Sequence, residues 1–185
     1  MVHITRQPLG MLVFPFISSL VMGWPFGYAS TPYNTIWACN NPRKAALMAA
    51  AGPTANLLIV ISCGIAIKVG IKAALFFEPN SIGLISIVGT DGGRILTGLS
   101  TFLSMMFSLN LIMVMLNLIP LPPLDGSSIA SLLLPANTAR NYWLIVTKPA
   151  FGFPGLVIAW QVIGPIINVV FPWATSLLYW GSNFK

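Results

Sequence analysis

One carboxylate in this chain occupies a position where it could do chemistry. Asp125 lies near the end of the stretch NLIPLPPLDG over residues 117–126, after a proline cluster and directly before Gly126. The stretch closes an almost uncharged run, Leu99 to Ile119. An ionised group at membrane depth is costly unless it meets a partner, a metal or water. Asp125 is therefore a candidate ligand, with the alternative that it is a turn residue and the N-cap of a helix over Ser127 to Leu134.

Carboxamide side chains lie inside two apolar runs of the sequence. Asn56 follows Gly52-Pro53, which predicts a kinked helix whose small residues let another helix approach closely. Asn110 and Asn117 are seven residues apart and so share one face of a helix. An amide at that depth needs a hydrogen-bond partner, so we expect this face to point into protein.

Other metal ligands are scarce. The only histidine is His3, which fits an ordinary loop residue, and the two cysteines, Cys39 and Cys63, are far apart in an interfacial loop and an apolar run. A catalytic zinc site normally needs three protein ligands. The sequence alone therefore assigns no residue a catalytic role, and it indicates no disulfide framework.

The composition is that of an integral membrane protein. Of 185 residues, 56% are hydrophobic and 6% are charged, against about 25% charged residues in an ordinary soluble domain. The net charge of +6 is spread between the apolar runs, where Lys and Arg act as interface anchors and contacts to lipid head groups. This distribution excludes nucleic acid as the expected partner. The basic residues are balanced on the two sides of the predicted spans, so they set no orientation.

The elements that must position these residues are helices. The sequence predicts an all-α membrane protein with three to four transmembrane helices and short interfacial or re-entrant segments, in one integral membrane domain over residues 1–185. We expect a short strand within the surface loop 69–98, at Ile82 to Val88. The run Pro8 to Gly23 favours a short or re-entrant helix over a signal peptide. The predicted spans are Ala45 to Ile67, Leu99 to Ile119 and Leu156 to Trp180.

Several short motifs occur in the order found in the site-2 proteases, and the chain resembles the C-terminal part of that family's core. Gly52-Pro-Thr-Ala-Asn56 is similar to the family's Gly-Pro-x-x-Asn element. Asn117-x-x-Pro120 and Leu124-Asp125-Gly126 are similar to its Asn, Pro and Asp-Gly motif. The loop before the central helix and the segment after Asp-Gly also match, at Gly23 to Tyr28, Asn41 to Ala45, Leu132 to Pro135 and Ala139-Arg140.

The resemblance implies specific roles. In that family an earlier helix carries His-Glu-x-x-His, whose histidines bind zinc while the Glu activates water, and the Asp of Leu-Asp-Gly is the third ligand. It assigns the zinc-ligand role to Asp125 only if such a helix lies upstream, and it places Asn56, Asn117 and Gly126 near the cleft. This sequence contains no His-Glu-x-x-His, so we expect no zinc cofactor for this chain by itself and expect the catalytic helix to be absent from it.

Two functional hypotheses follow, and the sequence favours the first narrowly. The chain is either a catalytically inactive scaffold or accessory subunit that packs against other transmembrane subunits, or a truncated or mis-started intramembrane zinc metalloprotease that cleaves transmembrane substrates. A channel or transporter is a weaker third class, because no paired charges or repeated halves occur. In either main case we expect the protein in the cell (inner) membrane, in contact with lipids.

Overall fold

The structure, a computed structural model, describes residues 35–146 and 151–180 together with the isolated positions 13, 16 and 20. The chain divides into two compact units, residues 1–35 and 36–185, and the elements below belong to the second apart from Thr35, the first residue of α3. His3 and nearly all of the run Pro8 to Gly23 lie outside the described residues. The prediction for that run therefore stays a prediction.

Three helices dominate the described residues and confirm the predicted membrane-spanning elements. They are α4 (Pro42–Lys72), α5 (Arg94–Leu118) and α8 (Gly152–Tyr179), and each is long and apolar enough to cross a membrane. The described parts are mostly helical and contain no named strand. All three helices begin several residues before the predicted spans, because turns that carry charges and prolines continue the backbone hydrogen bonding beyond the apolar residues.

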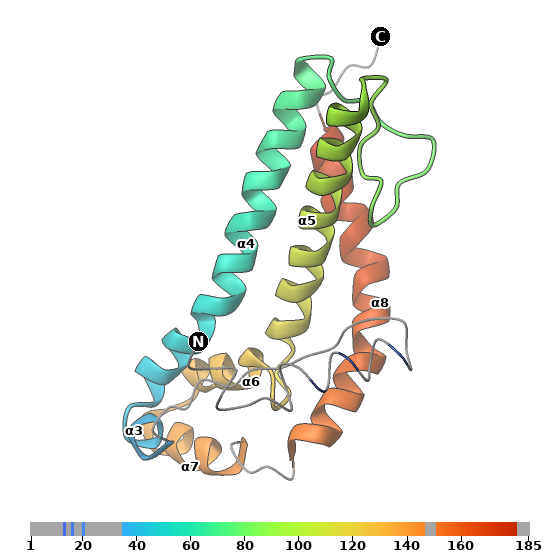
Figure 1. The fold of residues 1–185 in the computed structure, drawn as a ribbon. Helices are drawn as coiled ribbons and strands as arrows, with labels where there is room; N and C mark the ends of the chain where they lie inside the picture. Colours follow the sequence, from blue (N-terminus) through green and yellow to red (C-terminus); the bar gives the residue numbers. More distant parts are fainter. Residues whose placement is uncertain (1–12, 14–15, 17–19, 21–34, 147–150, 181–185) are drawn as a thin grey trace. The chain divides into compact units, whose positions relative to one another are not determined.

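The three helices lie beside one another around one apolar core (Figure 1). A loop at one end joins α4 to α5, and α8 runs back along α5 from the opposite end. Gly64 of α4 is buried where the three meet: a β-carbon there would lie 3.3 Å from Leu178 of α8 and 3.6 Å from Phe107 of α5. The small residue thus permits close helix packing. Other core residues from the three helices are Val60, Cys63, Ile67, Leu111, Met115, Ala159 and Ile163.

Short helices gather at the end of α4 and α5 that lies away from this loop (Figure 1). They are α3 (Thr35–Asn40), α6 (Asp125–Ala130), the 3-10 turn η2 (Ser131–Leu133) and α7 (Ala136–Val146). Two side chains of α7 tie it to its neighbours. The Tyr142 hydroxyl donates to the Ser127 carbonyl oxygen at 2.8 Å, and the Trp143 indole nitrogen donates to Ser131 Oγ at 3.2 Å. These contacts fix the segment that follows Asp125.

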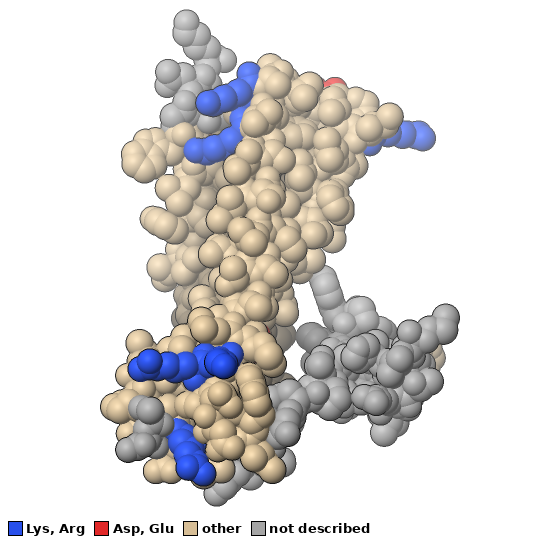
Figure 2. Space-filling view, turned by 90° about the vertical axis from the view of Figure 1, so that its left-hand side faces the viewer, with Lys and Arg blue, Asp and Glu red and all other residues tan. Residues whose placement is uncertain are grey.

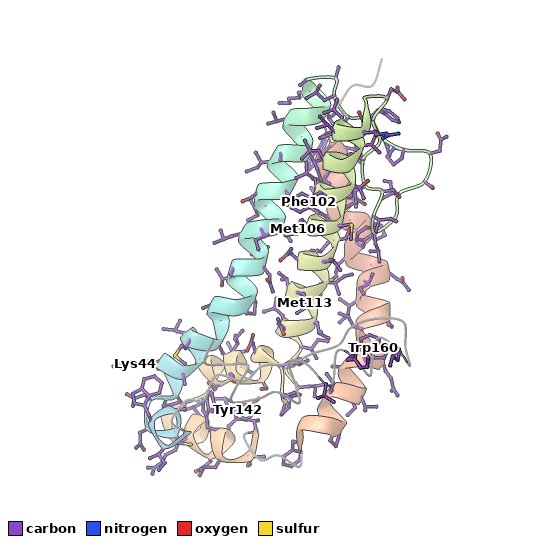
Figure 3. All side chains as sticks on the ribbon, viewed as in Figure 1. Lys44, Phe102, Met106, Met113, Tyr142 and Trp160 are labelled. Atoms are coloured by element: carbon purple, nitrogen blue, oxygen red, sulfur yellow. The ribbon has the colours of Figure 1, made fainter. Side chains whose placement is uncertain are left out.

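Among the residues that the structure describes, charged side chains lie at the two ends of the long helices. Figure 2 shows Lys and Arg at both ends, with a broad uncharged band between them. Lys44 and Tyr142 both lie at the end that carries α6 and α7 (Figure 3), whereas Met106 and Met113 lie along α5 within the uncharged band. An uncharged band flanked by basic residues is the pattern of a protein that crosses a bilayer. The protein is therefore a membrane protein.

The loop over residues 73–93 is held by hydrogen bonds rather than by a strand. It contains only two isolated bridges, Phe77 with Gly89 and Gly83 with Ser86, so the predicted strand over Ile82 to Val88 is wrong. A strand needs a partner along its length, and this segment instead places Ile87 and Val88 in the core. Ser104 Oγ of α5 accepts hydrogen bonds from their backbone N–H groups at 3.1 and 3.3 Å. The Tyr179 hydroxyl of α8 donates to the Ile87 carbonyl oxygen.

Ser104→Ala is expected to loosen this loop while the helices stay folded. Ser104 is fully buried, and its removal leaves the Ile87 and Val88 amides without their acceptor. A buried donor left unpaired costs about 1–3 kcal/mol. Hydrogen exchange measured by mass spectrometry should show faster exchange at Ile87 and Val88. Ser62→Ala is the control, because the exposed Ser62 hydroxyl bonds only to Leu58 of its own helix; equal exchange in both variants would contradict the role of Ser104.

Candidate functional site

The candidate site begins at the tight turn in which the chain reverses direction after α5. The proline cluster ends α5 and turns the chain, and α6 starts at Asp125 against the last carbonyls of α5. A β-carbon on Gly126 would overlap the carbonyl oxygens of Leu118 and Ile119, so only glycine allows this approach. Leu124 is buried in the core and anchors the turn. The Asp-Gly pair therefore has a packing reason: Gly126 sets the position from which Asp125 projects.

Asp125 lies against Gly52 of α4. A β-carbon built on Gly52 would be 3.0 Å from Asp125 Oδ2, which is tighter than about nine in ten real contacts of that kind. A β-carbon there would require the carboxylate to shift by a few tenths of an ångström, and a larger side chain would have to displace it. The two sequence elements that carry the family resemblance, separated by about 70 residues, are thus brought into contact by the packing of α4 on α6.

The carboxylate of Asp125 has no compensating partner among the residues that the structure describes. It makes no ion pair with them, and neither of its oxygens accepts a hydrogen bond from them. Partial burial raises the pKa of this carboxyl above its usual range, because removal from water disfavours the charged form. An acid held in a partly buried place without a partner is the kind of group that a metal or a donor from another segment would stabilise.

The N-cap interpretation of Asp125 is wrong. The N-cap of α6 is Leu124, in an extended conformation, and Asp125 is the first helical residue. Its side chain makes no capping hydrogen bond, and the helix ends at Ala130 rather than running to Leu134. Ser127 Oγ instead donates to the Leu124 carbonyl oxygen at 2.8 Å. The carboxylate therefore accepts no capping hydrogen bond from the backbone N–H groups of its own helix.

The two asparagines with family-equivalent positions lie close to this region in sequence. Asn56 is one helical turn after Gly52 on α4, and Asn117 is in the last turn of α5; both are half-buried. Asn110 donates to the Met106 carbonyl oxygen at 2.7 Å within α5, so its amide is partly satisfied locally. The structure thus brings Gly52, Asp125 and Gly126 together directly. It places Asn56 on α4, the helix that carries Gly52, and Asn117 on α5, the helix that precedes Asp125.

The described residues fit one ligand position of a metal centre and no more. A carboxylate is a suitable oxygen ligand for zinc. No group of three His, Cys, Asp or Glu side chains occurs among residues 35–146 and 151–180. Cys63 is in the helical core of α4, away from α6, and Cys39 is on α3. A complete three-ligand zinc site therefore cannot be assembled from this part of the chain alone.

Sequence reasoning missed one constraint near the site. Gly155 at the start of α8 is buried, and a β-carbon on it would overlap the carbonyl oxygen of Pro122 in the proline cluster. The start of α8 therefore supports the turn that presents Asp125. The sequence signal was a glycine between Pro154 and an apolar run, which is too common to single out without the packing.

Comparison with known proteins agrees with the geometry. The chain matches Peptidase family M50 over residues 15–147. It is 29% identical, over 170 residues, to the protein called "Putative zinc metalloprotease YwhC" from Bacillus subtilis (strain 168). That alignment covers 87% of this chain and 70% of the relative. No solved structure gives a significant match. The family match covers the Gly52 and Asp125 elements together with the turn and short helices between and after them, so the chain belongs to Peptidase family M50, the site-2 protease family.

Proposed function

We propose that this chain supplies the carboxylate ligand of a site-2-protease-type zinc centre and that it cleaves no peptide by itself. The observation that carries the proposal is the contact between Asp125 and Gly52. An unpaired, partly buried carboxylate lowers stability, yet Gly52 leaves room for it, and Gly126 allows the close approach to the end of α5 from which Asp125 projects. That arrangement has a purpose if Asp125 meets a cation there.

The remaining ligands would come from outside the described residues. The sequence holds one histidine, His3, and catalytic zinc needs three protein ligands. Two histidines on one turn of a transmembrane helix would complete the set, either on the same polypeptide or on a second one. When bound, the metal would lower the pKa of a water molecule and so make a nucleophile near neutral pH. The substrates would be transmembrane segments, and the compartment the cell (inner) membrane.

A second candidate function is a catalytically silent scaffold that packs against other transmembrane subunits. The observation that favours it is that Asp125 stands alone, with no group of three potential ligands in the described part of the chain. In this case a partner would cover Asp125 with a hydrogen-bond donor instead of a metal. Asn56 and Asn117 would lie on the same covered face.

The test is to purify the native protein from its own cells and to measure its intact mass and its zinc content together. If the first proposal holds, the preparation contains about one zinc per chain, together with a polypeptide that carries the two histidines. A preparation whose only polypeptide is the 185-residue chain, without zinc, would overturn it. Stable co-purification of other transmembrane subunits without zinc would support the scaffold.

A further inference from the structure

A cavity of about 720 Å³ lies at the end of the long helices opposite to Asp125. It is lined by the last turns of α8, by Trp180 directly after them, and by two residues of the loop over 73–93, Glu78 and Ile82. This loop lies beside the end of α8, away from the short helices α6 and α7 (Figure 1). Small-molecule sites have volumes of about 300–1,000 Å³. The cavity is therefore separate from the candidate zinc site and large enough for a small ligand.

Three hydroxyl groups line the cavity, and each already donates its proton within the protein. Thr175 Oγ1 and Ser176 Oγ donate to carbonyl oxygens one turn earlier in α8, at 3.0 and 2.7 Å. The Tyr179 hydroxyl donates to the Ile87 carbonyl oxygen of the loop. A hydroxyl has one proton and two lone pairs. These three groups can therefore only accept a hydrogen bond from a ligand.

Glu78 adds a negative charge to these acceptors. It is the only charged residue among those that line the cavity. Its exposed carboxylate makes no ion pair and accepts no hydrogen bond from another described residue. An ionised carboxylate is also an acceptor only. Among the lining side chains, the indole of Trp180 alone keeps an N–H group to donate.

This set of groups selects a primary ammonium ion. Such an ion carries a positive charge and three N–H donors and has no acceptor, so it is the complement of a carboxylate beside three accepting hydroxyls. The rings of Phe171, Tyr179 and Trp180 also line the cavity, and aromatic faces attract cations. A quaternary ammonium has no N–H group to satisfy the acceptors. An anion would be repelled by Glu78.

The position of the cavity in the membrane indicates where the ammonium comes from. Tyr179 ends the membrane-spanning part of α8, so the cavity lies at the level of the lipid head groups. Val162 and Val169 precede Ser176 at intervals of seven residues, which places all three on one face of α8. Both valines are exposed, so an apolar track runs from the cavity toward the middle of the bilayer. A lipid acyl chain fits such a track.

We propose that this cavity binds the head group of an ethanolamine phospholipid, with the ammonium at Glu78 and an acyl chain along Val162 and Val169. The phosphate next to the ammonium is an acceptor for the one remaining donor, the indole N–H of Trp180. The proposal is independent of zinc binding, because no residue of the cavity belongs to the Asp125 site.

Native mass spectrometry of the full chain in detergent tests the lipid preference. The protein is mixed with equal amounts of phosphatidylethanolamine, phosphatidylcholine and phosphatidylglycerol that carry the same acyl chains. We expect phosphatidylethanolamine to bind about tenfold more tightly than the other two, because choline has no N–H group and glycerol has no positive charge. Equal binding of the three lipids, or tighter binding of either of the others, would overturn the proposal.

Glu78→Gln tests the site itself. The change keeps the size of the side chain and removes its charge, and it lies on an exposed loop residue, so the fold should persist. We expect the affinity for phosphatidylethanolamine to fall about tenfold, because a hydrogen bond to a charged group is lost. Asp91→Asn is the matched control, since Asp91 is an exposed acid of the same loop that does not line the cavity. A preference that survives Glu78→Gln, or that both variants lose alike, would overturn the proposal.

A lysine side chain carries the same ammonium group, and Lys185 follows α8 closely in the sequence, outside the described residues. Lys185→Gln separates this source from the lipid. We expect the variant to bind phosphatidylethanolamine as the unchanged protein does. If phosphatidylethanolamine binds more tightly to the variant, or binds to the variant alone, the cavity belongs to the lysine and the proposal is wrong.

Discussion

Gly155→Ala is expected to destabilise the protein strongly. Gly155 is buried at the start of α8, and a β-carbon on it would overlap the carbonyl oxygen of Pro122. The obstacle is backbone within a proline-rich turn, so it cannot rotate away as a side chain could. The start of α8 must move off the turn instead. Overpacking of this kind costs roughly 1–3 kcal/mol, and more where the backbone cannot yield.

The measurement can use the thiol of Cys63, which is buried in the core between the three long helices. In a Cys39→Ser background, a thiol-reactive dye reports when heating in detergent exposes Cys63. Gly155→Ala should lower the midpoint of this transition by several degrees. Gly98→Ala is the control, because Gly98 is an exposed glycine of α5 and a β-carbon there meets nothing within 4 Å. Midpoints that shift alike in both variants would show that the contact with Pro122 does not matter.

The long helices could be predicted from sequence because hydrophobicity is a local property. A run of about 20 apolar residues is long enough to span a bilayer wherever it packs. The ends were less predictable, since α4 continues to Lys72 and α5 starts at Arg94, where charged residues stay helical at the membrane surface. The strand prediction for Ile82 to Val88 was wrong for the opposite reason, because the structure of this segment depends on distant residues. Its β-branched residues suit a strand, but they are buried by contacts with Ser104 and Tyr179 that lie far along the chain.

In the candidate site, too, local features could be predicted from the sequence and contacts between distant segments could not. Asp125 could be singled out because an acid among apolar residues is rare, and the family resemblance named its partners in order. The contact with Gly52 could not be predicted by counting residues, because it depends on how α6 folds back on α5 and then meets α4. From the sequence alone, Gly52 is predicted only to let another helix pack closely. Only the packing shows that its missing side chain makes room for a carboxylate.

Asp125→Ala is expected to remove zinc completely from the native protein as its own cells make it. This prediction rests on the proposed function, in which Asp125 is the single carboxylate ligand of a three-ligand site. Zinc content per chain should fall from about one to near zero on elemental analysis, and proteolysis of transmembrane substrates should stop with it. The fold should survive, because Asp125 makes no ion pair or side-chain hydrogen bond with the described residues.

Gly52→Leu should weaken zinc binding at the same site, although Gly52 is not itself a ligand. The new side chain would occupy the space of Asp125 Oδ2, since even a β-carbon would lie 3.0 Å from it. The carboxylate must then move, and displacing a ligand's support typically lowers metal affinity by about 10–100-fold. Ala51→Leu is the matched control, because the exposed Ala51 is the neighbouring residue of α4 and points in a different direction. If Gly52→Leu keeps full zinc affinity while Asp125→Ala loses it, Asp125 binds from a different position than the one seen here. If neither variant changes the zinc content, Asp125 is not a ligand and its contact with Gly52 belongs to the scaffold function.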